Sequence, residues 1–561
     1  MNQSSWIFFL MVFSALVHYD VSAASRQERQ NYQHLFDEAN AKLQEIDESR
    51  SCPGTALTLT CGNGKCEPER GENELNCPGD CLPALVKSYN AQTLCKDVKK
   101  VFVPVSQSEV ALIVQEAVRS GQNIRAIGNS HTSNEQLCTD GVVISTKALN
   151  HIIGLEKQSN SEVVTVEPGV TLSELTDWLD QRGKALGYNL IQYRGVSIAG
   201  AIATGAHGSS ARHPGVLASS VVALSIVDSK GQRSEYSADA TDPEIFKALR
   251  TSLGVTGIVV QIKLRIRSQF NLQVKTSYHS DAELFTQGGL VGQVSDCDFG
   301  QLLWFPHSKK FVKMCGKETL LLAERDAENS LLNPPVPNFI VKPYQVAFHY
   351  GACSSGLNCS LEDLRYASLT LIPPYKKRCL LGNLVNSRQV VGRSHRMMTS
   401  DLTSLSFAAH ELDWEIAVPF SQAQKALAFI SKRLADNRTC LPLTGLFIRY
   451  VMPEDTTLIA HTVAQGAFKA GEPAVLFELP SYMPVGLNPE MLAAYNQQFS
   501  GIAQTLITDF NGRAHWGKNN TAIFALQKGL GVFGDHLDRF RKIVHDFDPN
   551  GVFSNPFSAN F

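Results

Sequence analysis

The chain has 561 residues, of which 43% are hydrophobic and 19% are charged. This composition excludes a mostly disordered protein, and the length allows two or more domains with hydrophobic cores. The formal net charge of -2 excludes a strongly basic surface, so we expect no nucleic-acid partner.

Residues 1–23 read as a cleaved secretory signal peptide. The apolar run WIFFLMVFSALV is short for a membrane span, and the small residues Val21, Ser22 and Ala23 follow it. An uncleaved anchor is the alternative. No later segment has about 18 uninterrupted apolar residues, so we expect no transmembrane segment after cleavage. We expect the protein to be secreted or to occupy an oxidising lumen or periplasm.

Residues 24–97 predict an amphipathic helix followed by a small disulfide-rich module. Apolar residues at helical spacing in LFDEANAKLQEI indicate the helix. Because an exported chain favours disulfides, the module is expected to be held by its bridges. An all-cysteine zinc site is the rival interpretation, but we expect no metal. The module is a candidate contact for a protein partner. Six of the 13 cysteines lie here: Cys52, Cys61, Cys66, Cys77, Cys81 and Cys95.

Residues 98–270 predict one mixed α+β domain. Ser106 with Glu109, and Thr171 with Glu174, form two capping boxes that begin helices. Strand-like pairs at 152–155 with 163–166, and on either side of a turn at 228–231, predict two hairpins. A helix is expected from Pro243 to about residue 254, followed by the alternating strand GIVVQIKLRI. No GxGxxG motif lies between a strand and a helix, so a regular nucleotide-binding βαβ unit is not expected.

The remaining chain predicts a second domain and a docking tail. Residues 271–540 keep a mixed pattern, which favours a substrate or cap domain built as a sheet with helices on one face. At residues 541–561, FDPNGVFSNPF has a turn between aromatic anchors, so this segment is expected to dock back on the first domain.

Two glycine-rich loops, RAIGNSHTSN and GVSIAGAIATGAHGSS, lie between Arg125 and Ser209. Glycine lets a backbone approach a phosphate-bearing cofactor closely. Each loop carries one histidine, His131 or His207. Taken alone, either histidine could equally make a structural hydrogen bond.

Seven ordered motifs strengthen the interpretation: RAIGNSHTS, TVEPG, GVSIAGAIATGAHGSS, LGVTGIVV, LLWFPHS, AHWGK and FDPNGVFSNPF. In this order they resemble the FAD-linked sugar-lactone and alditol oxidases, the gulonolactone and arabinonolactone oxidase group of the vanillyl-alcohol oxidase superfamily. The resemblance implies an α+β fold, with a two-lobed FAD-binding domain and a mixed sheet-and-helix cap domain. It also implies FAD bound covalently through His131. The other implied FAD contacts are Gly128, Asn129, Ser130, Thr132, Ser197, Gly200, Thr204, Gly205, His207, Gly257 and Ile258.

The resemblance also implies roles near the flavin ring. Pro168, in TVEPG, lies where the family controls oxygen access, and a turn proline is a compatible interpretation. Lys518, in HWGK, would contact the flavin and stabilise negative charge. Arg449 would bind substrate, but Phe447 stands where related enzymes carry a glutamate.

Another group must therefore accept the hydroxyl proton. The candidates are Glu415, Glu478 and His515. For Glu415, packing at the edge of the core explains the residue equally well.

We therefore expect an exported FAD oxidase that acts on a CH–OH group of a sugar, alditol or aldonolactone, with oxygen as acceptor and hydrogen peroxide as product. An FAD dehydrogenase with another acceptor is one alternative. A catalytically inactive extracellular binding protein on the same scaffold is the other, and the loss of the glutamate favours it.

Overall fold

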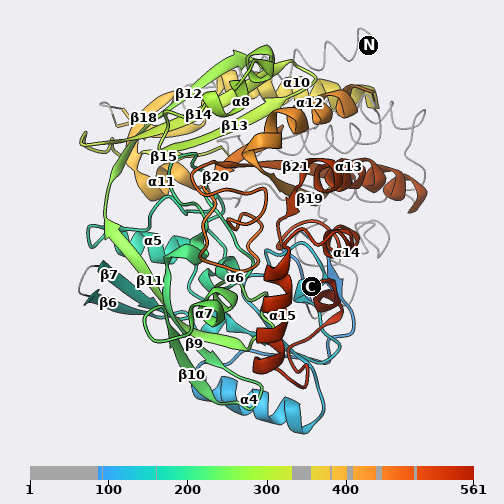
Figure 1. Cartoon of the computed structure of the whole chain (residues 1–561). Coiled ribbons are helices and arrows are strands. Elements are labelled where there is room, and N and C mark those ends of the chain that lie inside the picture. The colour runs from blue at the N-terminus through green and yellow to red at the C-terminus, as the bar shows by residue number, and fades with distance from the viewer. Residues whose placement is uncertain are drawn as a thin grey trace, which may run out of the picture.

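Figure 1 shows the computed structural model, which describes residues 86–90, 92–158, 161–331, 355–379, 382–400, 409–436, 445–484 and 489–561. The expected signal peptide at 1–23, and all of the expected module at 24–97 except its last residues, lie outside the described residues. In the part of the chain that is described, no helix is long and apolar enough to cross a membrane.

A small parallel sheet in the order β3-β5-β4 begins the first lobe. Helix α4 (Gln107–Arg119) starts after Ser106, whose hydroxyl accepts a hydrogen bond from the N–H of Glu109. The expected cap is confirmed, although the Glu109 carboxylate accepts from the N–H of Val105 rather than from that of Ser106. The strands are β3 (Lys100–Phe102), β4 (Ile124–Ile127) and β5 (Val142–Ser145), and the 3-10 turns η2 (Glu135–Leu137) and η3 (Thr146–Ala148) flank β5.

A six-stranded antiparallel sheet completes this lobe, in the order β10-β9-β11-β7-β6 with β8 also paired to β11. Both expected hairpins are confirmed, and alternate residues of β11 are buried as the sequence pattern predicts. The strands are β6 (Ile152–Gln158), β7 (Ser161–Val166), β8 (Lys184–Ala185), β9 (Val221–Val227), β10 (Arg233–Ser237) and β11 (Ile258–Ser268).

Four helical segments pack with this sheet: α5 (Leu172–Asp180), α6 (Ile198–Ala203), η4 (Leu217–Ser220) and α7 (Pro243–Arg250). The capping box of Thr171 and Glu174 at α5 is confirmed. Helix α7 ends at Arg250, earlier than expected. Gly254 instead adopts φ +71° in the turn that follows, a conformation that glycine tolerates.

The second lobe is built on an eight-stranded sheet in the order β18-β12-β14-β13-β20-β21-β19-β22, seen in the upper half of Figure 1. Helices α12 (Phe420–Asp436) and α13 (Pro489–Phe510) pack against β19 and β21. The strands are β12 (Asn271–Ser280), β13 (Phe299–Phe305), β14 (Lys310–Thr319), β18 (Gln389–Arg393), β19 (Ala409–Val418), β20 (Leu446–Val451), β21 (Ala474–Pro484) and β22 (Arg513–Ala514), with η5 (Asp281–Phe285) and α8 (Gly289–Gly292) between β12 and β13.

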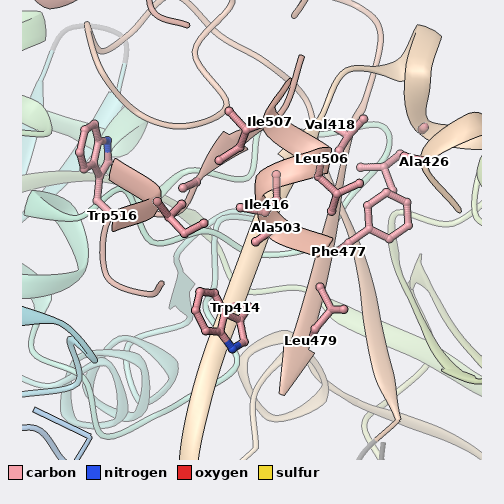
Figure 2. Close-up of a cluster of buried hydrophobic side chains, with 14 of the residues drawn as sticks. Trp414, Ile416, Val418, Ala426, Phe477, Leu479, Ala503, Leu506, Ile507 and Trp516 are labelled. Carbon is pink, nitrogen blue, oxygen red and sulfur yellow. The ribbon is translucent and has the colours of Figure 1, made fainter. Parts of the chain in front are cut away.

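Strand alternation gives this sheet two different faces. Figure 2 shows Trp414 and Ile416 of β19 with Phe477 and Leu479 of β21, gathered on the side of α13. Because successive side chains point to opposite faces of a strand, the intervening residues face away from this core. Among these residues, Asp413 lines a cavity and contacts Lys518.

Smaller elements complete the described chain. A three-stranded sheet contains β15 (Glu328–Asn329), β16 (Tyr375–Arg378) and β17 (Leu384–Ser387), with α10 (Ser355–Leu371) and α11 (Ser394–Met398) nearby in sequence. Strands β1 (Val86–Lys87) and β2 (Leu94–Cys95) form a ribbon. Two disulfides join Cys95 to Cys138 and Cys297 to Cys315. Cys95, counted above with the cysteine-rich module, thus pairs outside it.

The C-terminal segment contacts the first lobe. After α14 (Thr521–Gly529) and α15 (Asp535–Phe547), the carbonyl of Val552 accepts a hydrogen bond from the N–H of Ile124 at 2.8 Å. Before η6 (Pro556–Asn560), the Asn555 amide donates to the carbonyls of Gln136 and Cys138. These contacts hold the chain end beside the loop that carries His131.

Candidate active site

A cavity lies where the two glycine-rich loops meet the charged face of the eight-stranded sheet. The loop after β4, helix α6 and its flanks, strands β19 and β20, and the loop after β22 all contribute to its wall. Twelve of the predicted site residues line it: Gly128, Asn129, Ser130, His131, Thr132, Ser197, Gly200, Thr204, His207, Arg449, His515 and Lys518.

The two glycine-rich loops touch at Gly128 and Ser197. A Cβ atom at Gly128 would lie 1.9 Å from the Ser197 Oγ, so any larger residue would push the loops apart. The Asn129 side chain joins the loops further along, because its amide donates to the carbonyl of Gly195 at 2.7 Å. Glycine is therefore required here for close approach rather than for flexibility alone.

His131 projects into the cavity and lacks a polar partner. Its Nδ1 is buried and has no hydrogen-bond partner among the described residues, while its ring stacks on Tyr89 at 4.6 Å between centroids. Burial, with a smaller contribution from Lys147, lowers the pKa of His131 to about 4. The imidazole is therefore neutral at pH 7, which is the nucleophilic form.

The HWGK loop holds the His131 loop from the other lobe. The Ser133 N–H donates to the carbonyl of Gly517 at 2.9 Å, and the Asn134 amide donates to the carbonyls of Trp516 and Lys518. Asn134 was not predicted from the sequence. Its position three residues after His131 was the available signal, but its partners lie more than 380 residues away in the chain.

Arg125 brings an unsatisfied buried charge to the cavity wall. Its Nη2 donates to the carbonyl of Leu253 at 2.5 Å, but its Nε and Nη1 have no hydrogen-bond partner within the described chain. Burial lowers the pKa of Arg125 to about 10, so the group remains a cation at pH 7. Because an unpaired buried cation is costly, this position suits an anionic group supplied by a ligand.

At the sheet end of the cavity, neighbouring strands place carboxylates side by side. Glu415 of β19 pairs in register with Glu478 of β21, which in turn pairs with Phe447 of β20. The Lys518 Nζ lies 2.8 Å from the Glu415 Oε2, 2.5 Å from the Glu478 Oε1 and 3.2 Å from the Asp413 Oδ2. With Arg449 of β20, which lies beside Glu478, five charged side chains thus converge from β19, β20, β21 and the loop after β22.

Mutual attraction favours the charged forms of Glu415, Lys518 and Arg449 despite their burial. Burial by itself would raise the pKa of Glu415, but Lys518 and His207 hold it well below its usual range. Burial by itself would lower the pKa of Lys518, but three neighbouring carboxylates raise it above its usual value. Burial by itself would lower the pKa of Arg449, but Glu478 and Glu415 raise it above its usual value.

Phe447 occupies the position on β20 where a glutamate was expected, and it has a packing role there. Its ring packs in an apolar cluster with Leu303 and Phe305. The carboxylate beside Arg449 comes instead from the neighbouring strand, because the Glu478 Oε2 lies 2.8 Å from the Arg449 Nη2. The Gln192 amide oxygen also accepts from this guanidinium at 2.7 Å.

Three histidines surround Glu415. His207 donates from Nδ1 to the carbonyl of Gly208 at 2.8 Å, and its Nε2 lies 2.6 Å from the Glu415 Oε1. Both ring nitrogens of His207 therefore lie within hydrogen-bond distance of an oxygen acceptor. His515 is different: its Nδ1 accepts from the Gly517 N–H at 3.0 Å, and burial lowers its pKa to about 3. His461, which was not predicted, is fully buried, and burial lowers its pKa well below the usual value.

Six predicted site residues do not line the cavity: Pro168, Gly205, Gly257, Ile258, Glu415 and Glu478. Pro168 is buried below α6, and its carbonyl accepts from the Ala199 N–H. Gly257 has φ +128° and lies against Ile226 and Val227, while Ile258 is 1% exposed in the apolar core. The structure thus gives these last two residues a packing role.

The neutral buried histidines predict a fall in stability in mild acid. His515 and His461 stay neutral in the folded chain, whereas the unfolded chain binds their protons below pH ~6.5. Their contribution to stability is complete above that pH and is lost progressively as the pH falls toward the folded-state pKa, which is about 3 for His515. We expect the free energy of unfolding to fall by about 1.4 kcal/mol per pH unit for each histidine.

Urea unfolding at several pH values between about 7 and 4.5 measures this slope. The His515→Gln variant should show a shallower slope because it lacks one of the two groups. A flat stability profile in the wild-type protein would contradict the prediction.

Comparison with known proteins now places this geometry in a family. Residues 98–237 match the model of an FAD binding domain, and residues 262–561, more than half of the chain, match that of D-arabinono-1,4-lactone oxidase. The chain belongs to the D-arabinono-1,4-lactone oxidase family. It is therefore an FAD-dependent oxidase, as the seven motifs predicted.

The similarity to curated relatives extends over most of the oxidase. L-gulonolactone oxidase of Mus musculus is 24% identical over 81% of this chain and 93% of its own length. The D-arabinono-1,4-lactone oxidase of Eremothecium gossypii is 24% identical over 81% of this chain and 90% of its own length. A probable L-gulonolactone oxidase of Arabidopsis thaliana is 25% identical over 87% of each chain.

Among solved structures, the cholesterol oxidase of Brevibacterium sterolicum superimposes with a TM-score of 0.67. It is 16% identical and covers 84% of this chain and 96% of its own. This likeness confirms the expected fold. The FAD cofactor fits the cavity's residues: Arg125 offers an unsatisfied cation for a pyrophosphate, and Gly128 leaves a space that a Cβ would fill.

Proposed function

We propose that this oxidase converts a CH–OH group of a neutral sugar lactone or polyol into a carbonyl, with oxygen as electron acceptor and hydrogen peroxide as product. The names of the relatives support the lactone. The observation that carries the proposal is the pairing of Arg449 and Lys518 with carboxylates at one end of the cavity. An inactive binding protein would not need to keep these buried charges, which are costly to desolvate.

The charges of the cluster favour a neutral donor. Asp413, Glu415 and Glu478 already face Arg449 and Lys518, and Glu415 also contacts the ring of His207. No cation of this group is left to bind a substrate carboxylate. A ring-opened sugar acid would therefore add an unbalanced negative charge to a buried site.

In this proposal, the residues at the cavity wall have separate roles in the reaction. Arg449 and Gln192 orient the donor's hydroxyl groups at the cavity wall. Lys518 stays protonated and offers fixed positive charge that favours electron transfer into the site. FAD, when bound, accepts the hydride that leaves the donor carbon.

We further propose that His131 forms the covalent link to FAD. Its neutral imidazole faces the cavity, and its Nδ1 makes no hydrogen bond to the described chain that would compete with attack on the flavin. The HWGK loop fixes the chain just after His131 through Ser133 and Asn134, so little rearrangement is required.

Export is the last part of the proposal. The apolar run before Ala23 supports it, and so do the disulfides Cys95–Cys138 and Cys297–Cys315, which persist in oxidising compartments. Sequencing the N-terminus of secreted protein should find a chain that begins at Ala24. Retention of Met1 in the mature protein would contradict export by cleavage.

A donor screen tests the reaction. D-arabinono-1,4-lactone, L-gulonolactone and polyols should produce hydrogen peroxide, and each matching open-chain sugar acid should have a kcat/KM lower by about tenfold or more. Turnover with an artificial dye but not with oxygen would contradict oxygen as the electron acceptor and would identify the enzyme as a dehydrogenase. Preference for the sugar acids would contradict the neutral-donor proposal.

A further inference from the structure

Asp413 differs from the buried acids Glu415 and Glu478 because it lines the cavity. Of the described residues that line the cavity, it is the single carboxylate. It lies on β19 two residues before Glu415, so both side chains point to the same face of the sheet. Its exposed fraction is 3%, and the Lys518 Nζ lies 3.2 Å from its Oδ2. A donor in the cavity would therefore meet this acid directly.

The two other carboxylates lie behind the cavity wall. Glu478 bridges the Arg449 Nη2 at 2.8 Å and the Lys518 Nζ at 2.5 Å, so it positions two cations. Glu415 is fully buried between Lys518 and His207. Neither acid lines the cavity, so each acts on the donor through a neighbour.

The two histidines of this cluster that line the cavity, His207 and His515, already make hydrogen bonds within the protein. Both nitrogens of His207 already meet acceptors, namely the carbonyl of Gly208 and the Glu415 carboxylate. The Nδ1 of His515 accepts the N–H of Gly517, and the low pKa of this histidine, about 3, makes it a weak base. Among the acids and histidines of this cluster, Asp413 is therefore the carboxylate that a donor in the cavity can reach directly.

We propose that Asp413 is the general base that removes the proton from the donor's hydroxyl group. The inference rests on the proposed function. The O–H bond breaks and its proton passes to an Asp413 carboxylate oxygen. The C–H bond breaks and its electron pair leaves as hydride to FAD, the oxidant, so that the C–O bond becomes a carbonyl. Lys518 and Arg449 are the cations that balance charge beside this transfer.

The Asp413→Asn variant tests the proposal because it keeps the shape and removes the base. We expect its kcat to fall by about 10²–10⁴-fold, the usual contribution of a general base, with bound FAD and the thermal unfolding temperature near those of the wild type. In Asp413→Ala, added formate should restore part of the activity by acting as the base. Glu478→Ala is the matched control and should not be rescued by formate, because Glu478 does not line the cavity.

The reduction potential of bound FAD, measured without substrate, checks whether the Asp413 carboxylate lies close to the flavin. The reduction potential of bound FAD should rise in Asp413→Asn, because a negative charge that faces the cavity is removed. An unchanged potential would overturn the placement of Asp413 beside the flavin. A kcat in Asp413→Asn equal to that of the wild type would overturn only the role of Asp413 as general base. If the wild-type enzyme turned over no lactone or polyol, both the proposed function and the role of Asp413 would be overturned.

Discussion

Replacement of Lys518 by methionine is expected to reduce kcat by about 10²–10³-fold, the usual cost of removing one preorganised charge from an active site. The ammonium group contacts Asp413, Glu415 and Glu478, and no other lysine lines the cavity among the described residues. The reduction potential of bound FAD should fall in the same variant, because positive charge favours the reduced flavin.

The Lys518→Met variant should also be less stable, by about 3–5 kcal/mol, because three buried carboxylates lose their shared cation. Urea unfolding measures this loss. Lys469→Met is the matched control, since Lys469 is exposed and lies outside the cavity. If the single variant does not fold, the double variant Lys518→Met, Glu478→Gln removes one stranded negative charge and should fold while remaining slow.

Turnover close to the wild-type rate in a folded Lys518→Met variant would contradict the electrostatic role. Lys518→Arg gives a finer check. A planar guanidinium cannot occupy the compact position of an ammonium among three acids, so we expect partial activity rather than full rescue.

Replacement of His131 by alanine is the second large effect that we expect. Acid precipitation of the wild-type protein should leave the flavin in the pellet, whereas the His131→Ala pellet should be colourless with FAD in the supernatant. The kcat should fall by about tenfold or more, which corresponds to at least ~1.4 kcal/mol of barrier, because the covalent link is expected to raise the reduction potential of the flavin.

The fold of the His131→Ala variant should persist. The imidazole makes no hydrogen bond through Nδ1 within the described chain, and the contacts of the Ser133 N–H and the Asn134 side-chain amide with the HWGK loop remain. His545→Ala, at an exposed position on α15, is the matched control and should keep its flavin in the pellet. A colourless wild-type pellet would overturn the covalent link.

Local signals in the sequence predicted much of the first lobe. The caps at Ser106 and Thr171 and the alternation in β11 depend on neighbours a few residues away, so they can be read directly from the chain. The cofactor loops were recognisable for a related reason, because each loop is a continuous segment whose glycines permit close backbone approach.

The charged end of the cavity could not be predicted in this way. Asp413, Glu478 and Lys518 come from segments far apart in the chain, and strand register decides that they meet. The apolar neighbours of Asp413 and Glu478, Trp414 and Phe477, face the opposite core. A sequence pattern shows which residues share a face, but not which face will border the cavity.

The sequence by itself therefore determined the family, the FAD cofactor and the loops that surround it, because these depend on contiguous motifs. Tertiary structure alone decided that Phe447 joins an apolar cluster while Glu478 pairs with Arg449 from the next strand. It also decided that Gly257 and Ile258 pack in the core and that Asp413 faces the cavity. The physical reason is that long-range strand pairing sets which side chains share a buried site, and no local pattern specifies that pairing.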